Sequence, residues 1–389
     1  MNDFEIIPIK NALNSDFLSK HFEKKCGSLI MENYFEYVMC DEALVFSNDF
    51  FEHIKSLTHN IDNIFLKWYQ IYINEIEKNL SPEMYFFVDY LKNNFSLNDY
   101  LIARYDVAIE KETKKLKFLE INANTPGMIT DINDIATFLR PKWYRNISSW
   151  FKTYIKEKFK KYTGKKLAIL LPHSYADEDF MVCHDYRAIL EPIFWKENII
   201  IWDIYESNMV WNIFTLKWEK IDVILNFFPL EFFLTDRLFA KDFFDWIKNK
   251  YFDIYNNIES IILQDKLMFA LIWENIEKFN KEEQEIIKNH IPFTTRVFQE
   301  DEKKYVAKYR WWRLSRWVYE KDFYSNIDNK DDFVFQEKIH SHIIDDENNF
   351  FILWIYSNLK NTQAIIARKQ DVFITDDDKV HVLWCYIKK

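Results

Sequence analysis

The chain has 389 residues, 49% of them hydrophobic and 29% charged, with a formal net charge of −10. This length and composition predict a globular protein, either one large multi-lobed unit or two to three packed domains. We expect it in the cytoplasm, because we find neither a secretion signal at the start nor a run of the roughly 20 apolar residues that a membrane helix needs. The negative charge also argues against a nucleic-acid surface, which needs clustered cations, and the four scattered cysteines predict free thiols rather than disulfides or a metal site.

The first part of the chain is expected to be mainly helical. Apolar residues recur every three or four positions through Phe35–Phe51, Ile61–Ile76 and Met84–Phe95. Two strand-like runs, Ala103–Ile109 and Leu116–Asn122, follow on either side of a polar turn and predict a β-hairpin. A helical stretch is expected from there to about residue 159.

The rest of the chain alternates β-rich and helical segments. Three short β-rich runs predict the parallel sheet of an α/β lobe. They are Lys166–Leu171, Ile199–Ile204 and Ile221–Asn226. After a helix from about Ile261, further β-rich runs predict an antiparallel α+β lobe. These runs are Lys304–Tyr309, Phe333–Ile339, Phe350–Tyr356, Gln363–Ala367 and Val380–Ile387. We therefore predict an α/β fold built of α+β lobes, with approximate lobes at residues 1–160, 161–255 and 256–389.

Glycine is almost absent from the sequence. The chain has 3 glycines and 14 tryptophans, although about 7% glycine is usual and glycine is needed wherever the backbone takes a positive φ or approaches a phosphate. Trp195 and Trp218 stand shortly before strand-like runs, where a turn is expected, whereas Trp273 lies in an apolar helical run as an ordinary core aromatic. The tryptophans that punctuate a basic loop are Trp311, Trp312 and Trp317. One hypothesis is that several of these codons are stop-type codons that the source organism reads as glycine. The alternative is an AT-rich genome with biased composition, which does not account for the tryptophans.

The most informative polar pattern lies on the predicted hairpin. Residues two apart in a strand project to the same face, so Arg104 and Asp106 share one side of the first strand. Glu120 and Asn122 share one side of the second strand in the same way. If these faces align, an arginine, two carboxylates and an amide oxygen converge, and hard oxygen ligands of this kind suit Mg²⁺. The alternative from spacing alone is an exposed strand face with ordinary salt bridges.

The residues that follow this stripe carry a family resemblance. Arg104-Tyr105-Asp106, followed by LEINANTPG at Leu119–Gly127, resembles the signature of the glutathionylspermidine synthase family, in which an R-x-D strand precedes E-x-N-x-D/N-T-P. The resemblance extends over nearly the whole chain. It implies an ATP-grasp-type ligase with a pre-ATP-grasp lobe, without the amidase domain of the bifunctional members. Residues 161–255 would then form the substrate lobe and residues 256–389 the nucleotide lobe.

Later segments resemble the family's nucleotide site. Lys266 in Gln264-Asp265-Lys266-Leu267 resembles a lysine that contacts ATP phosphates, and Lys308 begins a stretch similar to the K-P-x-x-G-R-x-G loop. In this stretch Tyr309 replaces the usual Pro, and Trp312 and Ser315 stand where Gly is expected. The run Phe335–Ile339 falls where the adenine-binding hinge strand would lie. The resemblance therefore assigns ATP binding to Arg104, Asp106, Lys266, Lys308, Trp312, Arg313, Leu314, Ser315, Gln336, Glu337, Lys338 and Ile339.

The resemblance also implies catalytic and metal-binding roles. Asp106, Glu120 and Asn122 would hold the Mg²⁺ that accompanies ATP. Arg104 would be the catalytic residue, stabilising charge on the transferred phosphoryl group and on the tetrahedral intermediate. Arg368 fits the family's late arginine. The loop after Lys308 would close as a lid that excludes water.

The implied substrates are a glutathione-like acid and a spermidine-like amine. Thr125 would lie near the thiol peptide, and the acidic residues Asp177 and Glu178 match the segment that receives the polyamine. Glu231 is a second candidate for the amine. The alternative for the acidic residues is a solvated loop or a helix N-cap. The oligomeric state is left open by the sequence.

The implied activity is ATP-dependent ligation of a carboxylate to an amine through an acyl phosphate. Two alternatives remain open. One is a ligase of the same type that joins another acid and amine. The other is a nucleotide-binding pseudoenzyme, in which tryptophans that fill the phosphate loop have abolished catalysis.

Overall fold

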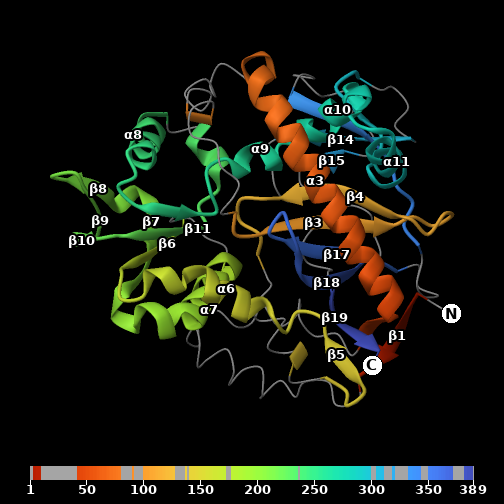
Figure 1. The fold of residues 1–389 in the computed structure, drawn as a ribbon, viewed down its shortest axis with the longest axis horizontal. Helices are drawn as coiled ribbons and strands as arrows, with labels where there is room; N and C mark the ends of the chain where they lie inside the picture. The colour runs from red at the N-terminus through yellow and green to blue at the C-terminus, as the bar shows by residue number, and fades with distance from the viewer. Residues whose placement is uncertain are drawn as a thin grey trace.

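The computed structural model describes residues 3–9, 42–79, 90–91, 100–127, 136–137, 140–171, 177–234, 237–298, 304–310, 318–319, 332–342, 349–370 and 381–388. Within these residues the strands form four sheets, and the helices lie against them (Figure 1). Two four-stranded sheets and a small three-stranded sheet accompany a large sheet of eight strands.

The large sheet joins distant parts of the chain. Its strand order is β1 (Phe4–Pro8), β2 (Glu42–Phe46), β19 (His381–Lys388), β18 (Thr362–Gln370), β17 (Phe350–Ser357), β3 (Ala103–Ile109) and β4 (Leu116–Asn122), with β5 (Tyr144–Asn146) beside β19. The long helix α3 (Asn48–Asn79) lies across one face (Figure 1). Leu353 and Ile355 of β17 pack in the core on that side, whereas Trp354 and Tyr356 belong to a second core on the other face. This alternation follows from the two-residue period of a strand.

A parallel sheet forms the middle of the chain, as the three short β-rich runs predicted. Its strand order is β12 (Asp253–Tyr255), β11 (Val223–Asn226), β6 (Leu167–Leu171) and β7 (Ile199–Asp203). Helices α6 (Phe151–Phe159) and α7 (Asp177–Phe194) lie on one side of it and α8 (Arg237–Lys248) on the other (Figure 1). The small antiparallel sheet consists of β8 (Ser207–Val210), β9 (Ile213–Leu216) and β10 (Glu219–Lys220).

The fourth sheet lies beside a group of short helices. Its order is β13 (Thr294–Thr295), β16 (Phe333–Glu337), β14 (Tyr305–Tyr309) and β15 (Val318–Tyr319). The helices are α9 (Ser260–Gln264), α10 (Leu267–Glu274) and α11 (Lys281–His290). Single 3₁₀ turns are η3 (Lys160–Tyr162), η4 (Lys196–Asn198), η5 (Ile204–Glu206), η6 (Leu230–Leu234) and η7 (Ile276–Lys278). A capping box of Asn280 and Glu283 fixes the start of α11.

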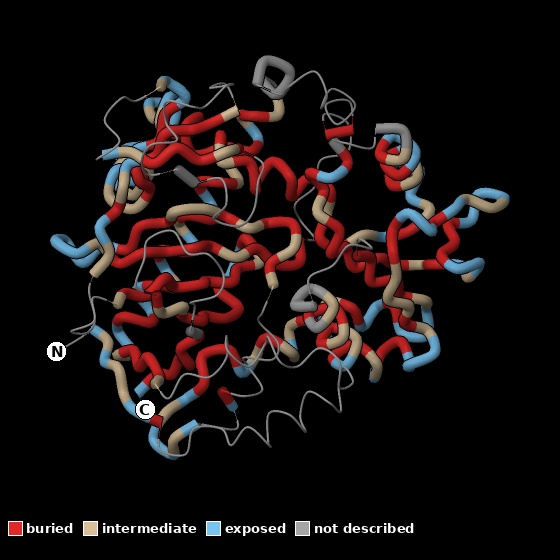
Figure 2. Tube along the Cα trace, turned by 180° about the vertical axis from the view of Figure 1, so that it is seen from behind, coloured by how far each residue is buried: buried red, intermediate tan, exposed pale blue. Residues whose placement is uncertain are grey.

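The core runs through the centres of the sheets. Figure 2 shows buried backbone along the central strands, with exposed residues gathered at turns and helix surfaces. All eight residues of β17 are buried. Among the described residues, no helix combines the length and apolar character needed to cross a membrane. Cys183 and Cys385 are buried free thiols, as predicted, and the other two cysteines lie outside the described residues.

The helical prediction for the opening is partly wrong. Helix α3 covers Ile61–Ile76 as predicted, but residues 42–46, inside the run Phe35–Phe51, form strand β2 between β1 and β19. The four apolar residues of β2 are buried, and a strand buried on both faces shows no two-residue alternation that could be told from a helix. Most of Met84–Phe95 lies outside the described residues.

Several tryptophans occupy backbone positions that favour glycine. Trp195 directly follows α7 with φ 63° and ψ 148°, a region that is almost exclusive to glycine. Trp211 (φ 53°) and Trp218 (φ 67°) each share a two-residue hairpin loop with another residue of positive φ, as in type I′ turns. Their exposed fractions are 55%, 93% and 84%. Trp273, in contrast, donates from Nε1 to the Pro292 carbonyl and is partly buried in α10, as expected.

Candidate active site

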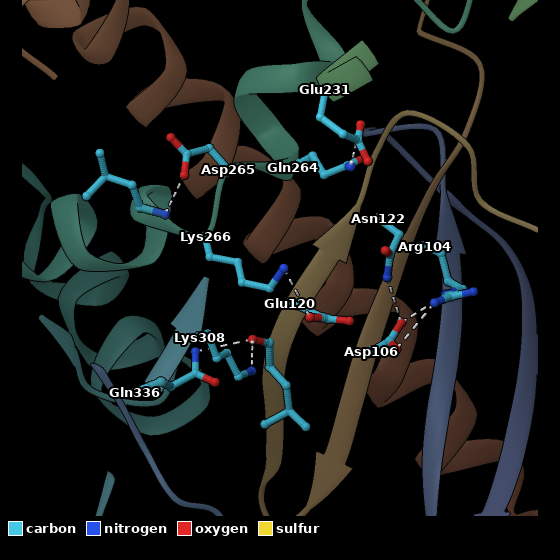
Figure 3. A network of polar contacts seen from close by, with 12 residues as sticks. Arg104, Asp106, Glu120, Asn122, Glu231, Gln264, Asp265, Lys266, Lys308 and Gln336 are labelled. Atoms are coloured by element: carbon cyan, nitrogen blue, oxygen red, sulfur yellow. Dashed lines mark hydrogen bonds and ion pairs between the residues drawn. The ribbon is translucent and has the colours of Figure 1, made fainter. Parts of the chain in front are cut away.

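Strands β3 and β4 bring the predicted polar stripe together. In their antiparallel register Arg104 faces Asn122 and Asp106 faces Glu120, so the predicted hairpin is confirmed and its two polar faces are aligned. Arg104 Nε lies 2.9 Å from Asp106 Oδ1, and the Asn122 amide nitrogen lies 3.3 Å from the same oxygen (Figure 3). The register shifts between Asp106 and Val107, a β-bulge of the kind found next to active sites.

The two carboxylates of this stripe have different electrostatic surroundings. Burial raises the pKa of Asp106, against the lowering effect of Arg104, and the neighbouring Glu120 raises it further. Burial also acts to raise the pKa of Glu120, but the cations of Lys266 and Lys308 outweigh it and hold that pKa at about 2. Glu120 is therefore an anion at neutral pH. Because Asn122 hydrogen-bonds both carboxylates, its amide group links the pair.

Two lysines reach this stripe from the neighbouring sheet and its helices. Lys266, directly before α10, places Nζ 3.8 Å from Glu120 Oε2. Lys308 of β14 donates from Nζ to the Leu119 carbonyl at 3.2 Å, and Gln336 of β16 donates to the same oxygen at 3.2 Å (Figure 3). Burial, with a contribution from Lys266, lowers the pKa of Lys308 to about 8, although Glu120 opposes the shift. Positive charge from two elements therefore meets at Glu120.

An aromatic side chain lies between two arginines on the same face of the large sheet. The Arg104 guanidinium lies 4.4 Å from the ring centroid of Trp354, and the Arg368 guanidinium lies 5.5 Å from it. Arg368 also acts to lower the pKa of Asp106. Arg368 therefore lies near Arg104 and Asp106. The spacing of residues in the sequence did not predict that Trp354 belongs to this site. Its strand β17 pairs with β3 but is far from the hairpin in sequence.

The remaining predicted residues lie at varied positions. Thr125 follows the end of β4 and is partly buried. In the segment predicted as the hinge strand, Gln336 and Glu337 end β16, and Lys338 and Ile339 follow it. Gln336 donates to the Leu119 carbonyl, Glu337 is exposed, Lys338 is partly exposed and donates its backbone N–H to the Lys304 carbonyl, and Ile339 is in the core. Asp177 and Glu178 begin α7, but their side chains lie outside the described set. Trp312, Arg313, Leu314 and Ser315 lie outside the described residues altogether.

A buried amide network beyond β4 was not predicted. Asn124 donates from its backbone N–H to Gln264 Oε1 at 3.1 Å and from Nδ2 to the Phe228 carbonyl at 3.1 Å. Gln264 Nε2 lies 3.5 Å from Glu231 Oε2, so the predicted amine-binding residue Glu231 is one side chain away from the end of the hairpin. Asn226, at the end of β11, donates to Asn124 Oδ1 at 3.2 Å. In the sequence, Asn124, the second Asn of the LEINAN run, was the residue that could have indicated this network.

The oxygen ligands of the site fit Mg²⁺ bound together with a phosphate. Mg²⁺ in nucleotide enzymes is held by one or two carboxylates completed by phosphate oxygens and water. Asp106, Glu120 and Asn122 supply two carboxylates and an amide. Among the described residues, no group of three or more His, Cys, Asp and Glu side chains is arranged to hold a metal alone. The oxygen atoms of Asp106, Glu120 and Asn122 therefore suit a hard cation whose remaining ligands come from a nucleotide and water.

Comparison with solved structures identifies the fold. The chain is similar to a glutathione synthetase-like effector from Globodera pallida in its apo form, with a TM-score of 0.59 and 12% sequence identity over 89% of each chain. A putative gamma-glutamylcysteine synthetase from Methylobacillus flagellatus KT matches with a TM-score of 0.34 and 10% identity over 81% of this chain and 84% of that one, a score too low to support an argument. No protein-family model and no curated protein matches the chain.

The protein therefore has an α/β fold of the glutathione synthetase-like, ATP-grasp type, as the sequence predicted. The likeness is one of fold, because the identity of 12% is low. The narrower resemblance to glutathionylspermidine synthase rests on the motifs and stays a prediction. The approximate boundaries of the lobes also stay a prediction, and strands from the first and the last of them share the large sheet.

Proposed function

We propose that the protein is an ATP-dependent carboxylate–amine ligase that forms an amide bond through an acyl phosphate. The observation that supports this best is the meeting of Arg104, Lys266 and Lys308 around the carboxylates of Asp106 and Glu120. A carboxylate is a poor electrophile. Such a ligase transfers the γ-phosphoryl group of ATP to the carboxylate, and the amine then displaces phosphate. This chemistry requires positioning and charge neutralisation more than covalent participation by the protein.

The residues divide these tasks. Lys266 and Lys308 bind the phosphates of ATP, since both ammonium groups lie beside Glu120 on converging elements. Arg104, held by Asp106, stabilises negative charge on the transferred group and on the tetrahedral intermediate. Mg²⁺, held by the two carboxylates and Asn122, would neutralise phosphate charge.

The proposed substrate pair comes from the resemblance of the motifs. A glutathione-like thiol peptide would supply the carboxylate near Thr125, and a spermidine-like polyamine would bind at Asp177 and Glu178. Glu231 supports an amine site near the hairpin, because this buried carboxylate adjoins Gln264 and hence Asn124. Carboxylates suit a polycation because they lower the free energy of the bound charge.

ADP release tests the proposal. We expect Mg·ATP to yield ADP in the presence of glutathione and spermidine together, and not with either one alone. Lys308→Met should abolish this release, whereas Lys55→Met, at a half-buried lysine that pairs with Glu52 on α3, should not. Full activity of Lys308→Met would exclude the proposed site.

The same assay separates the alternatives. ADP release with γ-glutamylcysteine and glycine, but not with glutathione and spermidine, would indicate a ligase for another pair. Tight binding of Mg·ATP without ADP release for any acid and amine would indicate a pseudoenzyme.

A further inference from the structure

A buried ion pair joins the two elements that carry the phosphate lysines. Arg310 Nε donates to Asp265 Oδ1 at 3.2 Å and Nη2 donates to Oδ2 at 2.6 Å, in the bidentate geometry that guanidinium and carboxylate groups favour. Asp265 is 1% exposed and Arg310 is 8% exposed. The backbone N–H of Lys266 donates to the Arg310 carbonyl at 3.2 Å, and the Leu267 N–H donates to Asp265 Oδ1 at 2.9 Å. The two contacts of the ion pair and the backbone bond from Lys266 to Arg310 therefore join the start of α10 to the end of β14.

The sequence positions of this pair connect it to the site. Asp265 directly precedes Lys266, and Arg310 follows Lys308 by two residues at the end of β14. The ammonium groups of the two lysines repel each other, because each lies near Glu120. Neither helix α10 nor strand β14 alone determines the distance between them. The ion pair connects the residue just before Lys266 to the residue just after β14, so it bridges the segments that carry the two lysines.

We propose that Asp265 and Arg310 form a positioning pair that holds Lys266 and Lys308 together at one phosphate-binding site. The inference rests on the proposed function, in which both lysines bind ATP phosphates. Neither Asp265 nor Arg310 contacts the phosphates in this arrangement. Each acts through the neighbouring lysine.

A second bidentate pair in the same region provides a matched control. Arg296 and Glu274 are joined by Nε–Oε1 and Nη2–Oε2 contacts of 2.9 and 2.5 Å, and their side chains are 47% and 30% exposed. Glu274 is at the far end of α10 from Lys266. This pair therefore has the same chemistry without a link to either lysine.

The test compares Arg310→Lys with Arg296→Lys. Lysine keeps the charge but loses the guanidinium fork, so Lys266 and Lys308 lose their fixed separation. We expect the Kd for a non-hydrolysable Mg·ATP analogue, measured by calorimetry, to rise at least about tenfold in Arg310→Lys and less than about twofold in Arg296→Lys. If Arg310→Lys does not fold, Asp265→Asn serves as the second variant. Circular dichroism establishes that each measured variant is folded.

Kinetics separate positioning from simple stabilisation. Displaced lysines raise the KM for ATP and leave the KM for the amine unchanged. A purely structural pair would instead lower the amount of active enzyme without changing either KM. Unchanged nucleotide affinity in Arg310→Lys, with binding lost in Lys308→Met, would overturn the positioning role and leave the proposed function intact. Retained binding in Lys308→Met would overturn the proposed site itself, and with it this inference.

Discussion

Replacing three tryptophans by glycine should stabilise this protein. A residue with a side chain in the left-handed region is disfavoured by about 1–2 kcal/mol, whereas glycine loses about 0.4–1 kcal/mol more backbone entropy on folding. The net gain is therefore about 1 kcal/mol for Trp211→Gly and for Trp218→Gly, whose side chains are 93% and 84% exposed and bury little apolar area. Trp195→Gly loses the packing of its ring, which lies 3.7 Å from the position that a Cβ would take at Gly164. It also relieves a backbone conformation that costs about 1–3 kcal/mol, so its gain should be of similar size.

Alanine variants isolate the backbone effect from loss of the indole. Alanine keeps the Cβ that the left-handed region disfavours, so Trp211→Gly should exceed Trp211→Ala in stability by about 1 kcal/mol. Trp143, which is 77% exposed and is not among the residues of positive φ, is the matched control. There alanine should be the more stable of the two, because glycine only adds unfolded-state entropy.

The measurement is urea unfolding followed by circular dichroism, since tryptophan fluorescence itself changes in these variants. The unfolding midpoints should rank glycine above alanine at Trp211 and Trp218, and alanine above glycine at Trp143. Equal midpoints for glycine and alanine at the first two sites would refute the backbone argument.

Mass spectrometry of native peptides would test directly the hypothesis that some of these positions are glycine in the native protein. Tryptophan at 312 and 317 in native peptides would refute it for the loop, whereas glycine there should restore tight Mg·ATP binding, measured by calorimetry.

Four further predictions follow from the charged groups. Glu120→Gln should lower ligase turnover by roughly 100-fold or more with an unchanged circular-dichroism spectrum, and an active variant would exclude the metal assignment. Because the pKa of Lys308 is about 8, Mg·ATP affinity should fall by up to about tenfold per pH unit above that value in calorimetric titrations, and Lys308→Arg should remove this fall. Neutralising Asp177 and Glu178 together should raise the KM for the amine but not for ATP; equal changes would assign them to the helix cap. Burial raises the pKa of Asp62 from 3.8 to about 7, so the folded state favours the protonated carboxyl group. The free energy of unfolding should therefore fall by about 4 kcal/mol as the pH rises from below 4 through 7. Asp62→Asn should flatten the urea midpoint over that range, and a parallel pH dependence in both proteins would disprove the assignment.

Local patterns in the sequence predicted much of the site. The two-residue period of the strands sufficed to predict that Arg104 and Asp106 share one face and that Glu120 and Asn122 share another. The register that sets Arg104 opposite Asn122 and Asp106 opposite Glu120 came from the structure. The parallel runs in the middle of the chain were predicted for a related reason, since short apolar runs between helices are typical of a buried parallel sheet. Both predictions depend on residues that are near each other in sequence.

Contacts between distant segments were not predictable from pattern alone. Strand β2 was mistaken for part of a helix because both of its partners, β1 and β19, are distant from it in sequence. The ion pair of Asp265 and Arg310 carried no signal either, because a salt bridge 45 residues apart leaves no periodicity. Resemblance to a family placed Lys266 and Lys308 in the site, but it did not indicate what holds them there.

The location of the site is related to the edge of a sheet. Among the strands that the structure describes, β4 is the last of the large sheet, and an edge strand presents backbone groups that no further strand pairs. Side chains from the neighbouring sheet occupy this edge: Lys308 and Gln336 both donate to the Leu119 carbonyl. Since Glu120 is the next residue of the edge, the same contacts that satisfy the backbone bring a lysine to its carboxylate. The edge of β4 is thereby joined to the neighbouring sheet instead of to another strand. The charged side chains of Glu120, Lys266 and Lys308 meet at this junction, where the proposed phosphate and its cation would bind.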